Sequence, residues 1–228
     1  MRLDQTERKT SASPRTTAVK ILHDLASALK VCHERGIVHL DMKTENVLVN
    51  ASMAMILTDF GIALLVPEGE DGQKCEQKIK GTSSWMAPEA AKDNILTVKS
   101  DIFGLGLVMF HVCTIVQRAE KAKPFHTKEW DVDHELQLTD NFNVGDFPIT
   151  YAYRLDLKDL IAEMLQPDWN KRPSAAVILE QISEWSRFEN NFEQAESMFT
   201  IFENFKGIKI RTSNTDHHDT FGTFTKSI

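Results

Sequence analysis

HLDMKTEN, residues 39–46, is a short polar stretch between the apolar pair at 37–38 and the apolar triplet at 47–49. It holds an aspartate at 41, a lysine two positions later and an asparagine five positions later. A carboxylate can orient a hydroxyl group and accept its proton, and amide and carboxylate oxygens are ligands that Mg²⁺ prefers. Taken singly, Asp41 could be a turn residue and Asn46 a cap, so this stretch needs support from the rest of the chain.

Two further motifs supply that support. DFG stands at residues 59–61 and APE at residues 87–89. Each tripeptide alone will occur by chance, and Asp59 alone could simply begin a tight turn. Turn chemistry does not require all three stretches in this order, so the joint pattern indicates a shared chemical purpose.

On these motifs, residues 14–185 resemble the protein kinase family. The resemblance implies a protein kinase-like fold, specifically its mainly α C-terminal lobe, with short β-strands around the catalytic and metal-binding loops. It also implies ATP and Mg²⁺ as cofactors and a protein as substrate. The implied reaction moves the γ-phosphoryl group of ATP to a serine or threonine hydroxyl.

The resemblance assigns three residues to catalysis. Asp41 would be the base that accepts the hydroxyl proton, and Lys43 would stabilise charge on the transferred phosphoryl group. Thr82 matches a threonine that hydrogen-bonds both of these residues. Lys43 and Thr82 match the pattern of serine/threonine kinases, which indicates the acceptor.

Other positions match the nucleotide and metal sites. Asn46 and Asp59 would hold Mg²⁺ against the phosphates of ATP, because this hard cation prefers oxygen ligands. Leu48 matches the floor of the adenine pocket, and Lys43 also faces the nucleotide. Gly61 would give the backbone freedom to turn beside Asp59.

Further matches are architectural. Glu89 and Arg172 resemble a buried ion pair, and Asp101 resembles a brace for the catalytic loop. His39 and Phe60 resemble members of a packed column in the family.

TAVKIL, residues 17–22, looks like the V-A-I-K strand that carries the ATP-binding lysine in this family. However, Lys20 lies only 21 positions before Asp41, within a helical pattern of apolar residues that runs from 21 to 32, and it should face water. The first glycine is Gly36, and G-x-G-x-x-G does not occur. We therefore expect the N-terminal β lobe to be missing from this chain and the isolated chain to be inactive. The alternative is a catalytically inactive, pseudokinase-like protein-interaction module.

The chain divides into three parts by pattern. Residues 1–13 read as a flexible lead-in and residues 14–186 as the kinase C-lobe, with helices beginning at 14 and covering 102–116, 155–165 and 175–185. Strands are expected at 37–38, 47–49 and 55–57, and a charged loop at 67–80. Residues 187–228 read as a tail whose helix, about 188–205, is amphipathic, and which is disordered after 211. Its apolar stripe could pack on the domain or dock a partner: Phe188, Phe192, Ala195, Phe199 and Phe202.

Composition excludes some classes of protein. The formal net charge of −7 over 228 residues argues against nucleic-acid binding, which needs a basic face. The longest weakly charged run, 102–116, is too short for a membrane span and contains His111. With no secretory signal pattern and three widely spaced cysteines, we expect an intracellular protein, in the cytoplasm or the nucleus.

Leu40 occupies the position of an arginine that, in many kinases, binds a phosphate on the activation loop. Residues 62–80 contain no Ser, Thr or Tyr, so this stretch has no hydroxyl group to carry the phosphate, and Leu40 could not bind one. We predict that activity does not need phosphorylation within 62–80, and that phosphatase treatment leaves the rate of peptide phosphorylation unchanged. Loss of activity traced to a phosphate on Ser83 or Ser84 would contradict this.

Overall fold

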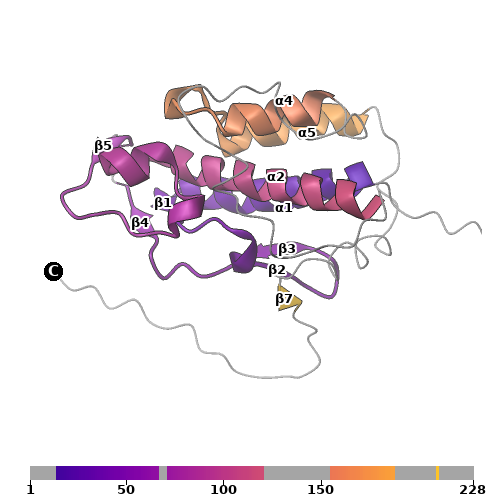
Figure 1. The fold of residues 1–228 in the computed structure, drawn as a ribbon, viewed down its shortest axis with the longest axis horizontal. Coiled ribbons are helices and arrows are strands. Elements are labelled where there is room, and N and C mark those ends of the chain that lie inside the picture. Colours follow the sequence, from indigo (N-terminus) through magenta and orange to yellow (C-terminus); the bar gives the residue numbers. More distant parts are fainter. Residues whose placement is uncertain (1–13, 67–70, 121–154, 188–208, 211–228) are drawn as a thin grey trace, which may run out of the picture.

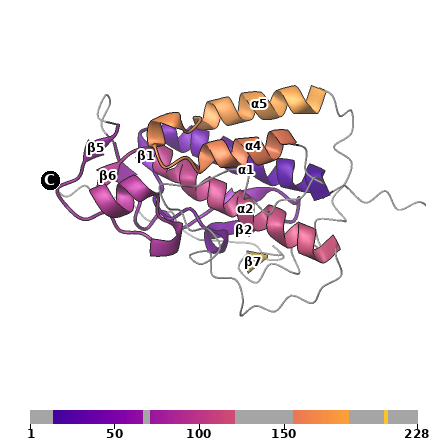
Figure 2. The ribbon, with the colours of Figure 1, turned by 45° about the horizontal axis from the view of Figure 1, so that its top comes forward.

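The computed structural model of the chain describes residues 14–66, 71–120, 155–187 and 209–210. Four helices dominate this part of the chain (Figure 1): α1 (Pro14–His33), α2 (Lys99–Glu120), α4 (Leu155–Met164) and α5 (Ala175–Arg187). α1 packs beside α2, and α4 and α5 lie over them as a second layer (Figure 2). The expected lead-in at 1–13 and the expected Phe-rich helix at 188–205 lie outside the described residues.

The sequence accounts well for α1. Pro14 occupies its first turn, where the missing N–H removes no helical hydrogen bond. Lys20 lies in this helix, as predicted, and its Nζ donates to Asp24 Oδ2 at 2.7 Å. The lysine side chain is 32% exposed, less than the sequence suggested. The apolar stripe faces the core, with these residues all buried: Ile21, Leu22, Leu25 and Leu29.

The helix α2 runs through the centre of the molecule (Figure 1). Every residue from 102 to 110 is buried, which explains why this segment is apolar around its whole circumference. The helix begins three residues before the predicted segment and ends four residues after it. Among the described residues, no helix combines the length and the apolar character that a membrane span requires.

Seven short strands occur in the described residues: β1 (Ile37–Val38), β2 (Val47–Val49), β3 (Met55–Leu57), β4 (Leu64–Leu65), β5 (Gln73–Lys74), β6 (Ile95–Leu96) and β7 (Lys209–Ile210). They form three small sheets. β1 pairs with β4, and β5 pairs with β6, both antiparallel. β2 pairs antiparallel with β3 and parallel with β7. The predictions for β1, β2 and β3 are confirmed.

The prediction of a loop at 67–80 is wrong in part, because β5 lies within it. Gln73 and Lys74 are both exposed and polar, so they carry no apolar alternation by which a strand could be recognised. The strand exists because the backbone of 73–74 pairs with Ile95 and Leu96. A tertiary contact therefore decides the conformation of this stretch.

Short helical turns connect the strands to the long helices. They are the 3₁₀ turns η1 (Thr44–Asn46), η2 (Ser83–Trp85) and η5 (Trp169–Lys171), and the π-helix η3 (Glu89–Asp93). Asn94 ends η3 in the left-handed conformation, with φ of 60°. Asparagine is one of the few residue types with a side chain that adopts this conformation readily.

The apolar interior consists of two clusters. The larger cluster joins α1, α2, α4 and α5 to β2 and β3. The smaller cluster lies beneath the segment between β5 and η3, and its buried members are Val38, Leu40, Ile79, Ala90 and Leu96. Leu40, at the position of the family's arginine, is thus a core residue here.

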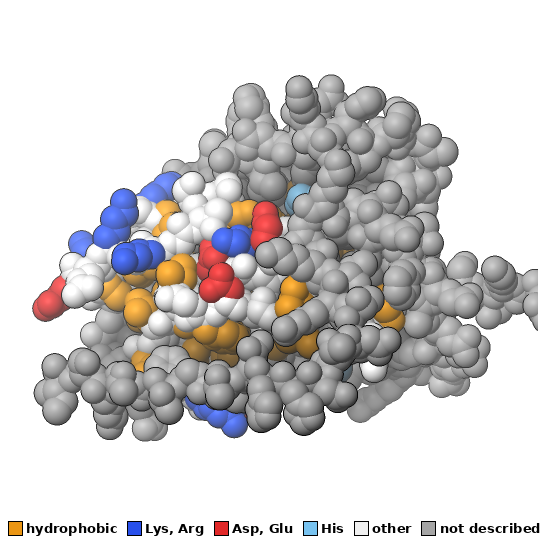
Figure 3. All heavy atoms as spheres, turned by 90° about the horizontal axis from the view of Figure 1, so that it is seen from below, with side chains coloured by type: hydrophobic (Ala, Val, Ile, Leu, Met, Phe, Trp, Pro, Cys, Tyr) orange, Lys and Arg blue, Asp and Glu red, His pale blue; other side chains and the backbone are white. Residues whose placement is uncertain are grey.

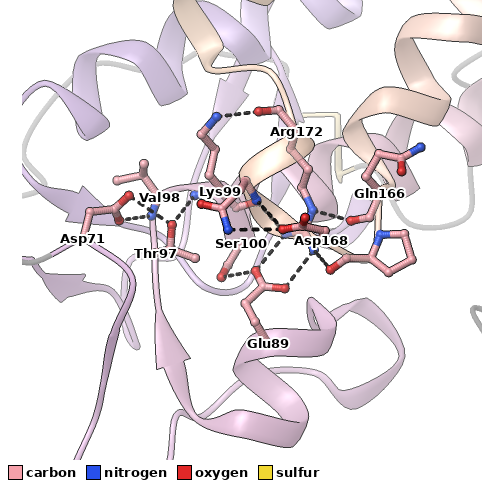
Figure 4. A network of polar contacts seen from close by, with 11 residues as sticks. Asp71, Glu89, Thr97, Val98, Lys99, Ser100, Gln166, Asp168 and Arg172 are labelled. Atoms are coloured by element: carbon pink, nitrogen blue, oxygen red, sulfur yellow. Dashed lines mark hydrogen bonds and ion pairs between the residues drawn. The ribbon is translucent and has the colours of Figure 1, made fainter. Parts of the chain in front are cut away.

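A buried ion pair between Glu89 and Arg172 ties η3 to the turn before α5 (Figure 4). Arg172 Nη1 donates to Glu89 Oε1 at 2.7 Å, and Nη2 donates to Glu89 Oε2 at 2.8 Å. This two-pronged geometry suits a guanidinium and a carboxylate. The expected pairing of these two residues is confirmed.

The remaining polar groups of this pair are also satisfied. Three carbonyl oxygens accept the other N–H groups of Arg172: Gln166 at 2.7 Å, Lys99 at 3.0 Å and Pro167 at 3.2 Å. All five donors of the guanidinium therefore have an acceptor. Ser100 Oγ donates to Glu89 Oε1 at 2.8 Å, and the Phe103 ring lies 4.8 Å from the Arg172 Cζ.

We predict that Arg172→Ala lowers the free energy of unfolding by about 3–5 kcal/mol, because Glu89 then keeps a buried charge without its partner. Urea denaturation followed by circular dichroism measures this loss. The control is Lys171→Ala, which changes an exposed neighbour and should cost less than about 0.5 kcal/mol. Equal stabilities for the two variants would show that the pair does not hold the fold.

Candidate active site

The stretch 39–46 lies against the first turns of α2, where Asp101 holds it. Asp101 Oδ2 accepts the backbone N–H of His39 at 2.8 Å, and Oδ1 accepts that of Leu40 at 2.8 Å. The left-handed backbone of Leu40, with φ of 66°, accompanies these two consecutive bonds to one carboxylate. Asp101 also binds His33 Nε2 at 2.9 Å and is fully buried. The expected brace is confirmed.

Gly104 lets this stretch approach α2 closely. A Cβ atom at Gly104 would lie 2.6 Å from the Met42 Cβ and 3.1 Å from the Met42 carbonyl oxygen. Both distances are shorter than normal packing allows, so a side chain here would push residues 41–43 away from α2.

Four of the predicted site residues form one hydrogen-bonded group around Asp41. Lys43 Nζ donates to Asp41 Oδ2 at 2.6 Å and to Thr82 Oγ1 at 2.8 Å. Thr82 Oγ1 donates to Asp41 Oδ1 at 2.7 Å. Asn46 Nδ2 donates to Asp41 Oδ2 and to the Asp41 carbonyl oxygen, both at 2.8 Å. The contacts implied for Thr82 are present.

These contacts determine the ionisation of Asp41. Burial alone would raise its pKa, but the hydrogen bonds from Lys43, Thr82 and Asn46, with the positive charge of Lys43, outweigh burial. The pKa of Asp41 is therefore lowered. At neutral pH the side chain is a carboxylate, which is the form that can accept a proton.

The hairpin of β2 and β3 brings Asn46 and Asp59 to the same end of a sheet. Thr58, next to Asp59, donates through its backbone N and its Oγ1 to the Asn46 carbonyl oxygen, at 2.9 and 3.0 Å. Asp59 itself is exposed and has a left-handed φ of 63°. Its Oδ1 accepts only the Gly61 N–H at 3.3 Å among the described residues.

The donor set at this end of the hairpin fits Mg²⁺. Asn46 uses its Nδ2 to bind Asp41, and its Oδ1 accepts no hydrogen bond from the described residues. Together with the Asp59 carboxylate it offers oxygen ligands only, which Mg²⁺ prefers. No group of three or more His, Cys, Asp or Glu side chains in the described residues could hold a metal. A Mg²⁺ ion here would therefore also need water or phosphate oxygens.

His39 and Phe60 pack together as the sequence implied. Their ring centroids are 4.7 Å apart in an edge-to-face arrangement. His39 Nδ1 accepts the Asp41 N–H at 3.2 Å, and Nε2 lies 2.9 Å from the Thr58 carbonyl oxygen. These two partners assign the proton to Nε2, so the ring links the backbone of Asp41 to that of Thr58.

Leu48 stands apart from this polar group. Val47 and Val49 in β2 point into the core, whereas Leu48 is half-buried and points to the opposite face of the strand. Its neighbour in β3, Ile56, is 43% exposed. Figure 3 shows exposed hydrophobic side chains on the same face as a group of acidic and basic side chains.

The sequence reasoning missed the residues that fix the segment leading to Thr82. The main one is Asn94, whose side chain bonds to three backbone groups between residues 75 and 79. Asparagine after the helical pattern EAAKD is a known signal for a left-handed helix end, and this signal could have identified the turn. The long-range hydrogen bonds have no signal in the sequence.

Comparison with known proteins agrees with these motifs. The chain is 25% identical over 181 residues to the serine/threonine-protein kinase PknB of Mycobacterium tuberculosis, covering 79% of this chain and 25% of that protein. It is 28% identical over 184 residues to a probable protein kinase of Dictyostelium discoideum, covering 79% and 45%. It is 31% identical over 174 residues to the serine/threonine-protein kinase/endoribonuclease IRE1a of Arabidopsis thaliana, covering 75% and 19%.

The chain thus spans less than half the length of each of these relatives. A family model, the protein kinase domain, matches residues 2–184, a range that includes the motifs at 39–46, 59–61 and 87–89 and both partners of the Glu89–Arg172 ion pair. The chain belongs to the protein kinase family.

Proposed function

We propose that residues 14–186 form the C-terminal lobe of a serine/threonine protein kinase domain that phosphorylates proteins with ATP. The observation that carries this proposal is the hydrogen-bonded group of Asp41, Lys43, Thr82 and Asn46. A structural role alone does not need a lysine, a threonine hydroxyl and an amide all directed at one carboxylate. The names of the relatives agree with the acceptor class.

In this proposal Asp41 is the base. The oxygen of a serine or threonine hydroxyl attacks the γ-phosphorus, the bond to the β-phosphate oxygen breaks, and ADP leaves. The hydroxyl proton passes to the Asp41 carboxylate, whose lowered pKa keeps it unprotonated at neutral pH. Lys43 lies 2.6 Å from Asp41, so its ammonium can stabilise negative charge on the phosphoryl group in transit.

Asn46 and Asp59 would hold Mg²⁺ through their side-chain oxygens. The ion would neutralise charge on the phosphates of ATP. Leu48 would contact the adenine ring from below, because it points away from the core and is half-buried. Thr82, bound to both Asp41 and Lys43, would hold these two side chains in position for the incoming hydroxyl.

Exposed apolar side chains support the assignment to one lobe. Phe60 and Leu64 are each 41% exposed and Leu65 is 71% exposed, all within six residues after Asp59. Exposed apolar groups of this size, close together, are typical of a surface that contacts another domain. We infer that an N-terminal lobe covers them and supplies the glycine-rich loop and the ATP-binding lysine, since Lys20 is engaged in α1.

The test is phosphoryl transfer by the protein in the length that its source cells make. The protein is captured with an antibody to residues 188–228, and its length is determined by mass spectrometry. It should then transfer label from [γ-³²P]ATP to serine and threonine residues of a peptide mixture. Asp41→Asn, introduced into that same protein, should lower the rate by about 10²–10⁴-fold, because the base is lost.

The matched control is Asp93→Asn, an exposed aspartate outside the site, which should leave the rate unchanged. Equal rates for wild type and Asp41→Asn would remove Asp41 from catalysis. Absence of label transfer by the folded wild-type protein would overturn the proposed function. Label on tyrosine would overturn the acceptor class.

A second prediction concerns the ionisation of Asp41. Lys43→Met removes a hydrogen bond and a positive charge, both of which lower the pKa of Asp41, so this pKa should rise. In the wild type, the stability due to Asp41 is fully present above the ordinary aspartate pKa of about 3.9 and is lost as pH falls through the lowered folded value. In Lys43→Met this contribution should be smaller, and its loss should be complete at a higher pH, because the folded pKa lies closer to the unfolded value.

Carbon-13 NMR of the labelled aspartate carboxyl groups between pH 2 and 6 measures the pKa directly. The control Lys30→Met breaks an exposed ion pair with Glu34, and since Lys30 is not among the groups that shift the pKa of Asp41, this pKa should stay unchanged. An unchanged pKa in Lys43→Met would show that the lysine does not act on Asp41.

A further inference from the structure

The segment between residues 71 and 80 lacks any hydroxyl group that could carry a phosphate, yet it is fixed at several points. Near its start, Asp71 Oδ1 accepts the Val98 N–H at 2.9 Å, and Oδ2 accepts the Thr97 hydroxyl at 3.2 Å (Figure 4). The Gly72 N–H then donates to the Leu96 carbonyl oxygen at 2.9 Å. The pairing of β5 with β6 continues this attachment.

Asn94 fixes the second half of the segment. Its Nδ2 donates to the Cys75 carbonyl oxygen at 2.7 Å and to the Gln77 carbonyl oxygen at 2.8 Å. Its Oδ1 accepts the Ile79 N–H at 2.7 Å, and its own carbonyl oxygen accepts the Cys75 N–H at 2.9 Å. One side chain therefore binds three backbone groups spread over five residues.

The bond to Ile79 has a direct consequence for the site. Ile79 is 3% exposed and packs in the smaller apolar cluster with Leu40, the residue before Asp41. Three residues after Ile79, Thr82 binds Asp41 Oδ1 through its hydroxyl at 2.7 Å and through its backbone N at 3.3 Å. A slip of the segment at Ile79 would therefore move Thr82 away from Asp41.

The geometry assigns Asn94 as the positioning residue that holds residues 75–79 in register, so that Ile79 packs on Leu40 and Thr82 reaches Asp41 without a phosphate. Asn94 touches none of the groups that would react, so it acts through Ile79 and Thr82. Its left-handed backbone directs the side chain back over the segment, a conformation that few other residues adopt at low cost. That this arrangement serves phosphoryl transfer rests on the proposed function.

The test uses Asn94→Gly in the full 228-residue chain. Glycine keeps the left-handed backbone accessible and removes only the side-chain hydrogen bonds. The control is Asn50→Gly, because Asn50 also binds two backbone N–H groups, those of Ser52 and Ala54, in the turn between β2 and β3. Both variants thus lose an asparagine whose side chain binds nearby backbone groups, but only Asn94 contacts residues 75–79.

Hydrogen exchange of the Cys75 and Ile79 amides should accelerate roughly 10- to 100-fold in Asn94→Gly, as expected for the loss of three hydrogen bonds. Trypsin should cleave the native variant faster after Lys78 and Lys80. The Thr82 amide, which donates to Asp41 Oδ1 at 3.3 Å, should also exchange faster. Exchange in α2 should stay at the wild-type rate, and Asn50→Gly should change none of these measurements.

None of these measurements needs catalysis, so they can succeed even if label transfer fails. Wild-type exchange at Ile79 in Asn94→Gly would overturn the assignment. Acceleration in α2 equal to that at Ile79 would also overturn it, because the segment would then have no separate anchor. A freed segment with wild-type exchange at the Thr82 amide would remove Asn94 from the positioning of Thr82.

Discussion

A carboxylate that is removed from water needs hydrogen-bond donors around it. Asp101 is such a carboxylate, and the donors that it binds determine how the site is built. Its two oxygens accept the N–H groups of His39 and Leu40 and bind the imidazole of His33. These bonds fix the backbone immediately before Asp41 to α2, in which residues 100–110 are all buried. The direction in which Asp41 points is therefore set by the core, and the polar group around it depends on the packing of α2.

A second buried charge extends the same principle to the segment beyond Thr82. Glu89 and Arg172 satisfy one another and the surrounding carbonyl oxygens, so η3 has one position relative to α2 and α5. Asn94 follows η3 directly, and its side chain binds the backbone of residues 75–79, so the position of η3 also determines the position of that segment. Thr82 therefore lies between two segments that buried charges hold in place. Asp101 positions the stretch that carries Asp41, and the Glu89–Arg172 pair positions the segment that carries Thr82.

The sequence predicted those parts of the fold that depend on local pattern. The apolar periodicity of α1, α4 and α5 and the continuous apolar run of α2 identified the helices, and the triplets at 47–49 and 55–57 identified the hairpin beneath Asn46 and Asp59. The motifs also identified Asp101, Glu89 and Arg172 before their contacts were known. The strand at 73–74 and the role of Asn94 were missed, because their cause is pairing between segments about twenty residues apart. Neither Gln73 nor Lys74 shows by its own chemistry that it will be paired.

The separation of Glu89 from Arg172 along the chain has a consequence for assembly. The partners are 83 residues apart, and α1 packs against α5 across an even longer interval. Contacts of this range close late, because the intervening chain must be ordered first. During synthesis, from the N-terminus onward, the residues of the site leave the ribosome well before Arg172 does. The Glu89–Arg172 pair, on which the position of the segment leading to Thr82 depends, can therefore form only after translation has reached the start of α5.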